Sequence, residues 1–454
     1  MKIVKLGTAS ARKSIAEMRQ KLSFGTAVVT QDSRRKTMQV FGEDLSPIES
    51  VRRIVSDVRR EGDEAVFRYT KLLDGFELTG KNFRVSPDEI AAAGREVSKG
   101  FLKAAQKAIE RVRRFQERIL EKDPPELSDG GRRLSVKLLP VRRVGVHVPG
   151  FSAVLPSSVI MTCVPAQVAG VKEIALCSPP NASGKVCAET LACCGMLGVE
   201  EVYRMGGAQA IAALALGTAS VAKVDMVAGP GNLFTTLAKK EVFGEAAIDL
   251  LAGPSEVLVL ADDSAQADVV AADLLAQAEH APAAAFLVTP SAALARAVAA
   301  EVEKQLQGLS RRDRAAAVME EYSLAIVTTT MEEAVELAND LAPEHLEIVT
   351  TQDDAMLSKI RSAGTVFVGG WTPTAAGDYI AGPSHTLPTG GTAKFASGLS
   401  ANSFLRRMSI VRYDRTSLEK DREDIVTLAE TEGLTAHAQS VRIRFRKGEA
   451  GDAK

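Results

Sequence analysis

From residue 144 onward, short runs rich in β-branched residues alternate with Ala-rich stretches of helical spacing. The predicted strands are residues 144–148, 173–176, 201–204, 224–227, 257–261, 285–289 and 323–328. Strands separated by helices pair in parallel, because each helical crossover returns the chain to the same edge of the sheet. The sequence therefore predicts an α/β fold with a mainly parallel, doubly wound sheet, or two such sheets in succession.

The length of 454 residues exceeds what one hydrophobic core holds, so we expect at least two domains. Residues 46–123 have a helical pattern, with capping-box signals at Ser46-Pro-Ile-Glu49 and Ser86-Pro-Asp-Glu89. Residues 1–45 are weakly patterned, with a helix near 14–22. After residue 400 we expect a helix over 416–432 and an alternating strand over 441–445. Both ends contain too little apolar material for their own core, so we expect them to dock elsewhere.

The composition, 46% hydrophobic and 25% charged residues, is typical of a soluble globular protein. A net charge of −1 excludes a general attraction for nucleic acid or for anionic membranes. The sequence has neither an apolar run long enough to span a bilayer nor a signal-type N-terminus, which favours the cytoplasm. The five Cys lack C-x-x-C spacing and lie among apolar residues, so we interpret them as small buried hydrophobes.

The sequence predicts that the stretch 343–391 contains the active-site chemistry. After a predicted strand at 364–370, it has no regular period for about twenty residues, and loops of that length are usually functional or disordered. Interleaved apolar residues and the chain's only Trp argue against disorder. Two of the five His of the chain, His345 and His385, fall in this stretch, beside Glu344 and Asp378.

Glu344 and His345 follow a helix capped at Thr330, and Pro343 forces Glu344 into an extended segment. Adjacent residues of an extended chain point to opposite sides, so we expect different tasks for the two. One would take a proton from the substrate, while the other would activate water or hold the substrate. The alternative is an exposed strand start with two polar residues.

A predicted helix over residues 268–280 places Asp273, Gln277 and His280 on one face. A His one turn from an oxygen ligand is a common half of a metal site, but spacing does not choose among Gln277, Asp273 and Glu279. The alternative for His280 is a His favoured by the helix dipole. The polar residues that could complete such a site are Asp378, His385 and His437. Two imidazoles with a carboxylate and an amide oxygen suit Zn²⁺.

Three polar, glycine-containing loops end predicted strands at what should be one sheet edge. They are His147-Val-Pro-Gly150, Gly206-Gly-Ala-Gln209 and Gly229-Pro-Gly231-Asn232. The last lacks the third Gly of the dinucleotide fingerprint, since Phe234 stands there. A tight turn would explain it equally well, yet three such loops at the carboxyl ends of parallel strands favour a ligand site.

Taken together, the motifs resemble the series found in the histidinol dehydrogenase family, in the family's order. They are Ala252-Gly-Pro-Ser-Glu256, Gln277-Ala-Glu-His280, Ala342-Pro-Glu-His-Leu346, Gly377-Asp-Tyr, His385-Thr-Leu-Pro-Thr389 and Glu432-Gly-Leu-Thr-Ala-His437. The resemblance spans residues 46–446. It implies a zinc- and NAD-dependent enzyme that oxidises L-histidinol through histidinal to L-histidine, in two hydride transfers.

The resemblance also implies a role for each matching residue. The zinc ligands would be Gln277, His280, Asp378 and His437. Substrate contacts would come from these ligands and from Ser255, His345, His385 and Glu432. His345 would be the general base, Glu344 would activate water, and NAD would contact His147, Gln209 and Asn232.

Family members fold as two incomplete Rossmann-like domains with small terminal arms, an aldehyde-dehydrogenase-like architecture. The resemblance implies an N-terminal arm (1–45), a larger α/β domain (46–143 and 256–398), an NAD-binding domain (144–255) and a C-terminal dimerisation arm (399–454). It further implies a homodimer with exchanged C-terminal arms, in which Glu432 and His437 act in trans.

The sequence departs from the family pattern near the expected cofactor site. His147 stands where many members have Tyr, Phe151 where they have Gly, and Ser384 where Asn is frequent. The main alternative is a related NAD-dependent dehydrogenase of another small amino alcohol or sulfonated diol. A zinc hydrolase and a non-enzymatic metal-binding or assembly protein are further alternatives.

Overall fold

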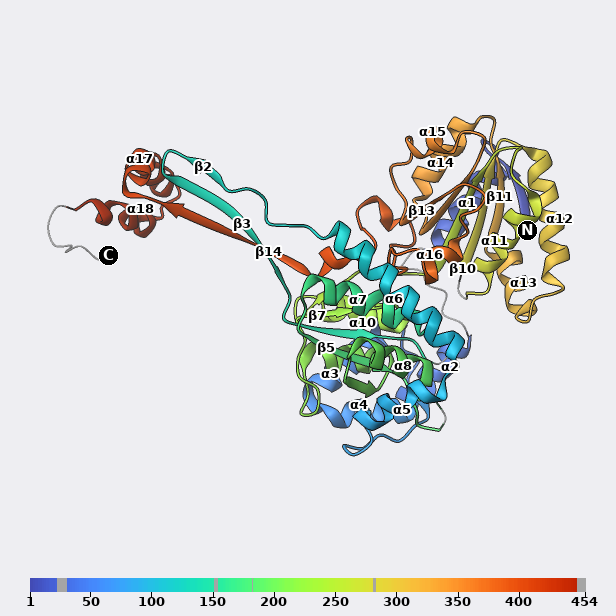
Figure 1. Ribbon diagram of the computed structural model, residues 1–454, viewed down its shortest axis with the longest axis horizontal. Coiled ribbons are helices and arrows are strands. Elements are labelled where there is room, and N and C mark those ends of the chain that lie inside the picture. Colours follow the sequence, from blue (N-terminus) through green and yellow to red (C-terminus); the bar gives the residue numbers. More distant parts are fainter. Residues whose placement is uncertain (23–30, 151–153, 182, 281–282, 447–454) are drawn as a thin grey trace. The chain divides into compact units, whose positions relative to one another are not determined.

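The computed structural model describes residues 1–22, 31–150, 154–181, 183–280 and 283–446 (Figure 1). Within these ranges, no helix is long and apolar enough to cross a membrane. The chain divides into two compact units. The first comprises Met1–Leu120 and Val141–Phe404, and the second comprises Glu121–Pro140 and Leu405–Lys454.

The first unit contains parallel sheets and their covering helices. Its strands are β1 (Lys2–Lys5), β4 (Arg143–His147), β5 (Glu173–Ser178), β6 (Glu201–Arg204), β7 (Met226–Ala228), β8 (Ala247–Ile248), β9 (Ser255–Ala261), β10 (Ala283–Thr289), β11 (Ser323–Val327), β12 (His345–Val349) and β13 (Thr365–Val368). Its helices are α1 (Ala9–Leu22), α2 (Gln31–Phe41), α3 (Pro47–Glu61), α4 (Asp63–Asp74), α5 (Pro87–Glu96), α6 (Lys99–Ile119), α7 (Ser157–Ala169), α8 (Ala188–Leu197), α9 (Gly207–Leu216), α10 (Leu233–Val242), α11 (Ala267–Ala278), α12 (Ala292–Leu306), α13 (Arg312–Glu321), α14 (Met331–Leu341), α15 (Asp353–Leu357) and α16 (Thr374–Tyr379), with short 3₁₀ helices η1 (Thr392–Lys394) and η2 (Ala401–Phe404). The predicted α/β class and the succession of two parallel sheets are confirmed.

The first sheet has five parallel strands in the order β6-β5-β4-β7-β8. The chain runs outward from β4 to β5 and β6, then returns to add β7 on the other side of β4. Such a reversal leaves a crevice at the carboxyl ends of the two central strands. The loops after β4 and β7, which the sequence had singled out, both begin there.

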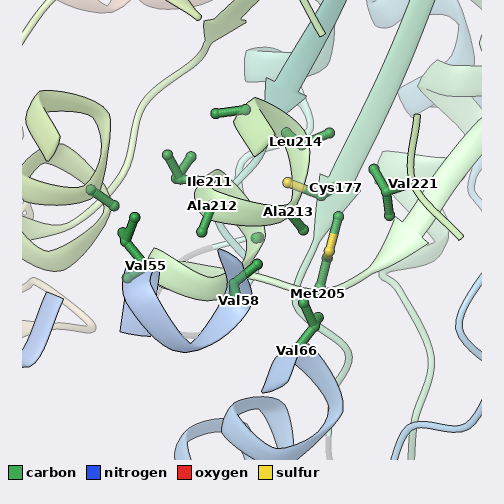
Figure 2. Packing of buried hydrophobic residues seen from close by; sticks show 14 of the residues in the cluster. Val55, Val58, Val66, Cys177, Met205, Ile211, Ala212, Ala213, Leu214 and Val221 are labelled. Carbon is green, nitrogen blue, oxygen red and sulfur yellow. The ribbon is translucent and has the colours of Figure 1, made fainter. Parts of the chain in front are cut away.

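Helix α9 lies at the centre of the core that covers the five-stranded sheet, because it is apolar on all sides. Its residues Ala208 to Ala215 are all buried, as expected for a helix without a polar face. Figure 2 shows Ile211 and Leu214 of α9 among Val55 and Val58 of α3 and Val66 of α4, with Cys177 of β5 nearby. A helix of this kind needs a second covering layer, and α3 and α4 provide it.

The packing of α3 and α4 bears on the expected domain bounds, which stay a prediction. Residues 46–143 were expected to join 256–398, yet the apolar residues of α3 and α4 share their core with the five-stranded sheet. Helix α3 buries Val51, Ile54, Val55 and Val58, a stripe at helical spacing that faces α9. The capping boxes at Ser46 and Ser86 begin α3 and α5 as predicted.

The five cysteines are free thiols, and all but the half-buried Cys187 are buried. Burial raises the pKa of Cys163 and of Cys193 to about 12, so neither is a ready nucleophile. The interpretation of the cysteines as small hydrophobic residues agrees with this environment.

The second sheet has six parallel strands in the order β1-β11-β10-β9-β12-β13. Strand β1, which weak patterning had hidden, completes one edge, and Ile15 and Met18 of α1 pack in the same core as Leu258 and Phe286. The order of strands reverses at β9: β10 and β11 are added on one side of it, and β12 and β13 on the other. A crossover helix runs antiparallel to the strand it follows, so the C-terminal ends of the helices return to the amino edge of the sheet.

The second unit is a small antiparallel sheet with two helices. It contains β2 (Leu127–Asp129), β3 (Arg132–Pro140), β14 (Leu405–Tyr413), α17 (Arg415–Thr431), α18 (Thr435–Arg442) and η3 (Ile443–Phe445). The sheet order is β14-β3-β2. The strand expected at 441–445 is wrong, since this segment completes a helix and a 3₁₀ turn. Ala438 and Val441 are one helical turn apart and pack on Val426 and Ala429.

A buried ion pair holds the loop after β7. Lys239 of α10 is 4% exposed, and its Nζ donates to Asp249 Oδ1 at 2.7 Å and to the Gly229 carbonyl oxygen. Asp249 Oδ2 in turn accepts the Gly229 N–H at 2.8 Å. The pair thus clamps both backbone groups of Gly229 and fixes the Gly-Pro-Gly-Asn loop.

Lys239→Met should lower the free energy of unfolding by ~3–5 kcal/mol, because it leaves Asp249 buried without its countercharge. Urea unfolding followed by circular dichroism measures the loss. Lys223→Met is the matched control, since Lys223 pairs with the exposed Glu245 and should cost at most ~1 kcal/mol. Equal losses in the two variants would contradict a structural role for the buried pair.

Candidate active site

Glu344 is held at the amino edge of the six-stranded sheet by the first residues of β9. Its Oε2 accepts the Ser255 hydroxyl at 2.6 Å and the Glu256 N–H at 3.0 Å. Burial raises the pKa of Glu344, while nearby His345 and the hydrogen bond from Ser255 oppose that shift. A carboxylate held on one oxygen keeps its other oxygen, Oε1, as a proton acceptor.

His345 begins β12 and is also fixed by β9. Its Nδ1 lies 3.1 Å from the Glu256 carbonyl oxygen, which can only accept, so Nδ1 carries a hydrogen. Its Nε2 lies 3.7 Å from Asp378 Oδ1. Burial alone would lower the pKa of His345, but the carboxylates of Glu344 and Asp378 raise it to about 9.

The expectation that Glu344 and His345 face opposite sides is wrong. The His345 Nδ1 lies 3.6 Å from Glu344 Oε2. Strict alternation does not apply because Glu344 precedes the strand, just after a sharp turn. Ala342 makes this turn at the end of α14 with φ 49°, the left-handed region that an L-residue rarely adopts. The turn directs both side chains toward β9.

Helix α11 brings Gln277 and His280 to the same edge. Gln277 is buried, and its Nε2 donates to Ser255 Oγ at 2.5 Å. His280, just beyond the helix, is exposed on one side; the burial of the rest of the ring lowers its pKa, and the nearby Asp378 carboxylate opposes this. Asp273 faces Glu347 instead, and burial and that neighbour raise the pKa of Asp273 to about 7. Of the oxygen ligands that spacing left open, Gln277 joins Ser255 and Glu344.

Asp378 lies on a helix where the sequence predicted none. Helix α16 begins where Thr374 donates from its N–H and its hydroxyl to Glu347 Oε1, at 2.9 and 2.6 Å. A buried strand carboxylate thus organises the segment, and no local period signals this. Burial alone would raise the pKa of Asp378, but the neighbouring His345 outweighs this effect, so the pKa of Asp378 is lowered. Asp378 is therefore an anion among imidazoles.

His385 is tied down on both ring nitrogens. Nδ1 lies 3.0 Å from the Asp378 carbonyl oxygen, and Nε2 lies 3.1 Å from Ser158 Oγ of α7. The loop containing His385 is also held where Gly390 N donates to Glu256 Oε1 at 2.8 Å. Sequence reasoning missed Ser158 and Glu256, whose partners His385 and Gly390 lie 227 and 134 residues away in the chain.

The expected NAD-contacting residues lie in the five-stranded half. His147 ends β4, with Nδ1 2.8 Å from the Pro230 carbonyl oxygen; burial lowers its pKa to about 4, so the ring is neutral. Asn232 caps α10: its Oδ1 accepts the Thr235 N–H at 3.1 Å, which leaves the NH₂ group of the side chain to donate. Gln209 is buried, and its amide donates to Asp74. The first two lie at the crevice between β4 and β7.

Glu432 and His437 belong to the second unit, where both are exposed. The described residues contain no cluster of three or more His, Cys, Asp or Glu able to hold a metal. Of the expected ligand set, only His280 and Asp378 are of those residue types in the first unit, and the assignment of this set stays a prediction. The donor chemistry there, an amide oxygen, an imidazole and a carboxylate kept ionised, fits Zn²⁺.

Comparison with known proteins gives a consistent result. The family profile of histidinol dehydrogenase matches residues 41–445. A histidinol dehydrogenase of Rhodopirellula baltica is 46% identical over 96% of this chain and 95% of its own length. A histidinol dehydrogenase of Moorella thermoacetica is 48% identical over 87% of this chain and 93% of its own length. The crystal structure of histidinol dehydrogenase from Elizabethkingia anophelis has a TM-score of 0.87, with 34% identity and 98% of both chains covered.

This chain belongs to the histidinol dehydrogenase family. Histidinol dehydrogenases are NAD-dependent oxidoreductases that catalyse the final steps of histidine biosynthesis. The resemblance expected from the motifs is therefore confirmed, and so are the fold class and the enzyme class.

Glu256→Gln should flatten the pH dependence of stability in the metal-free protein. Burial and Glu344 raise the pKa of Glu256 from 4.5 to about 8, so the folded protein binds this proton more tightly than the unfolded chain. Its contribution to stability is full below about pH 4.5 and is lost as the pH rises through about 8. Thermal midpoints of parent and variant across this window provide the measurement.

The glutamine keeps an acceptor oxygen for Gly390, so only the titration is removed. Glu245→Gln is the control, because its ion pairs lower the pKa of Glu245 and it does not titrate in the window. Parallel curves for parent and Glu256→Gln would refute the assignment of this proton.

Proposed function

We propose that this chain oxidises L-histidinol to L-histidine with a Zn²⁺ held by Gln277, His280, Asp378 and His437. The observation that supports it is the convergence of Gln277, Glu344 and His345 on the first two residues of β9. This arrangement joins a neutral oxygen ligand, a proton-accepting carboxylate and an imidazole within one hydrogen-bonded group.

Bound zinc would hold the amino group and imidazole of the substrate and so supply position, while the nicotinamide accepts hydride. The other tasks fall to the side chains of this chain. Asp378 supplies the anionic ligand. In the metal-free site the same carboxylate faces His345 and lies near His280, which accounts for its lowered pKa.

His345 is the proposed general base for removal of the hydroxyl proton. The Glu256 carbonyl holds the hydrogen on Nδ1, which makes Nε2 the nitrogen that takes the proton once the ring is neutral. A proton must leave the alcohol as hydride departs, in each of the two oxidations. A ring with one nitrogen fixed presents the other in a constant direction.

Glu344 is the proposed acceptor of the proton from water that adds to the aldehyde. Its Oε2 is committed to Ser255 and Glu256, so Oε1 is the oxygen that takes this proton. Burial raises the pKa of Glu344, which strengthens it as a base. His385 and Glu432 are the proposed substrate contacts.

For NAD we propose the crevice after β4 and β7, with contacts from His147 and Asn232 there and from Gln209 at the start of α9. The clamped loop at Gly229 and the start of α10 suit a pyrophosphate, because backbone N–H groups at a helix start attract anions. His147 in place of the common Tyr supplies a neutral imidazole at this crevice.

We further propose a homodimer, in the cytoplasm, in which the second unit completes the partner's site. Its surface exposes Leu127 at 59%, Val411 at 65% and Leu428 at 66%, apolar side chains that a partner subunit would cover. The dimer would supply Glu432 and His437 in trans. Activity assays on a mixture of two inactive variants, one changed at His437 and one at His280, would distinguish the arrangements. Recovered activity would indicate that His437 acts in trans, and no recovery would indicate that it acts in cis.

Purified protein given L-histidinol, NAD⁺ and Zn²⁺ should produce two NADH for each histidine, because an alcohol and then an aldehyde are oxidised. NADH absorbance and histidine quantification provide the measurement. Absence of NADH would discard histidinol, and NADH formation with other amino alcohols or sulfonated diols would then indicate a related dehydrogenase. Metal-dependent hydrolysis without NAD reduction would instead favour a hydrolase.

His437→Asn should abolish zinc binding at stoichiometric metal, together with activity, while the protein stays folded. The His437 side chain is exposed in the second unit, so its removal costs no core packing. Zinc content after gel filtration and a circular dichroism melt provide the measurements. An active, zinc-loaded variant would contradict the ligand assignment.

A further inference from the structure

The hydroxyl of Ser255 connects Gln277 to Glu344. Ser255 Oγ lies 2.5 Å from Gln277 Nε2 and 2.6 Å from Glu344 Oε2, and all three side chains lie at the amino edge of the six-stranded sheet. A serine hydroxyl has one hydrogen and accepts through its lone pairs. Ser255 therefore donates to only one of these two neighbours.

The backbone N–H of Glu256 shows which of the two neighbours accepts the serine hydrogen. Glu344 Oε2 already accepts the Glu256 N–H at 3.0 Å, so this oxygen acts as an acceptor whether or not the carboxyl group is protonated on its other oxygen. The hydrogen between Ser255 and Glu344 must then come from the serine. Ser255 consequently accepts from Gln277, which has to present its NH₂ group.

The same reasoning fixes the direction of the Gln277 amide. If Nε2 faces Ser255, Oε1 faces away from it, and a metal requires the oxygen of an amide as its ligand. Gln277 is buried at 3% exposure, where an unpaired amide group is costly, so the Ser255 contact selects one orientation. In the flipped orientation the amide would present its NH₂ group, which cannot serve as a ligand, toward the metal.

We propose that Ser255 is a positioning residue that orients the amide of Gln277 for zinc and couples it to Glu344. This deepens the proposed function and rests on Gln277 being a zinc ligand. Ser255 acts here through its two neighbours, in addition to any contact with substrate. Groups that orient metal ligands are commonly worth about 10–100-fold in metal affinity.

The test measures zinc affinity of the full-length protein by competition with a chelator, without substrate or NAD. Ser255→Ala should weaken zinc binding by about 10–100-fold, and Ser255→Thr, which retains the hydroxyl, should restore most of the loss. Ser291→Ala is the matched control. Its buried hydroxyl caps α12, away from the site, so it should leave zinc affinity unchanged.

A double-mutant cycle separates positioning from general destabilisation. If Ser255 acts through Gln277, then Ser255→Ala in a Gln277→Ala background should add little further loss. Additive losses, or an unchanged affinity in Ser255→Ala, would overturn the proposal. Unchanged affinity in Gln277→Ala alone would overturn the zinc assignment itself and with it the proposal. Circular dichroism of the metal-free variants identifies any that fail to fold.

Discussion

The arrangement of the site depends on the hydrogen bonds made by the first two residues of β9. The Ser255 hydroxyl and the Glu256 N–H hold Glu344, and the Glu256 carbonyl holds the His345 ring. The Glu256 side chain holds the loop that contains His385, through Gly390. Backbone groups on a central strand of a buried parallel sheet move little, so they give the reacting side chains fixed directions before any ligand arrives.

The topology explains why these groups meet at an edge that α/β proteins use less often for ligands. Catalytic candidates lie at the amino ends of β9 and β12, whereas the proposed cofactor loops lie at the carboxyl ends of β4 and β7. The antiparallel course of the crossover helix α11 returns Gln277 to the amino edge, and Glu347 holds the start of the short helix that contains Asp378. On the proposed assignment, the six-stranded sheet would supply the catalytic groups and the five-stranded sheet the cofactor loops. Ser158 of α7 contacts His385 of the catalytic loop.

The sequence predicted the features that local patterns encode. Capping boxes, the parallel strands and the helix that contains Gln277 have short-range causes, and the motif series revealed the family. Long-range effects were hidden: β1 gains its order from pairing with β11, and α16 is organised by Glu347. The strand expected at 441–445 failed because the contacts of Ala438 outweighed an alternating pattern. Spacing could not select Gln277 over Asp273, since the partners Ser255 and Glu347 are distant in sequence.

The central claim is that one amide oxygen, one carboxylate and two imidazoles meet at a single metal ion beside Glu344 and His345. X-ray absorption spectroscopy of the zinc-loaded protein tests it most directly, because ring carbons of imidazole give distinct scattering and sulfur gives a longer bond, about 2.3 Å. We expect four nitrogen and oxygen ligands, including two imidazoles. A sulfur ligand, or fewer than two imidazoles, would contradict the account.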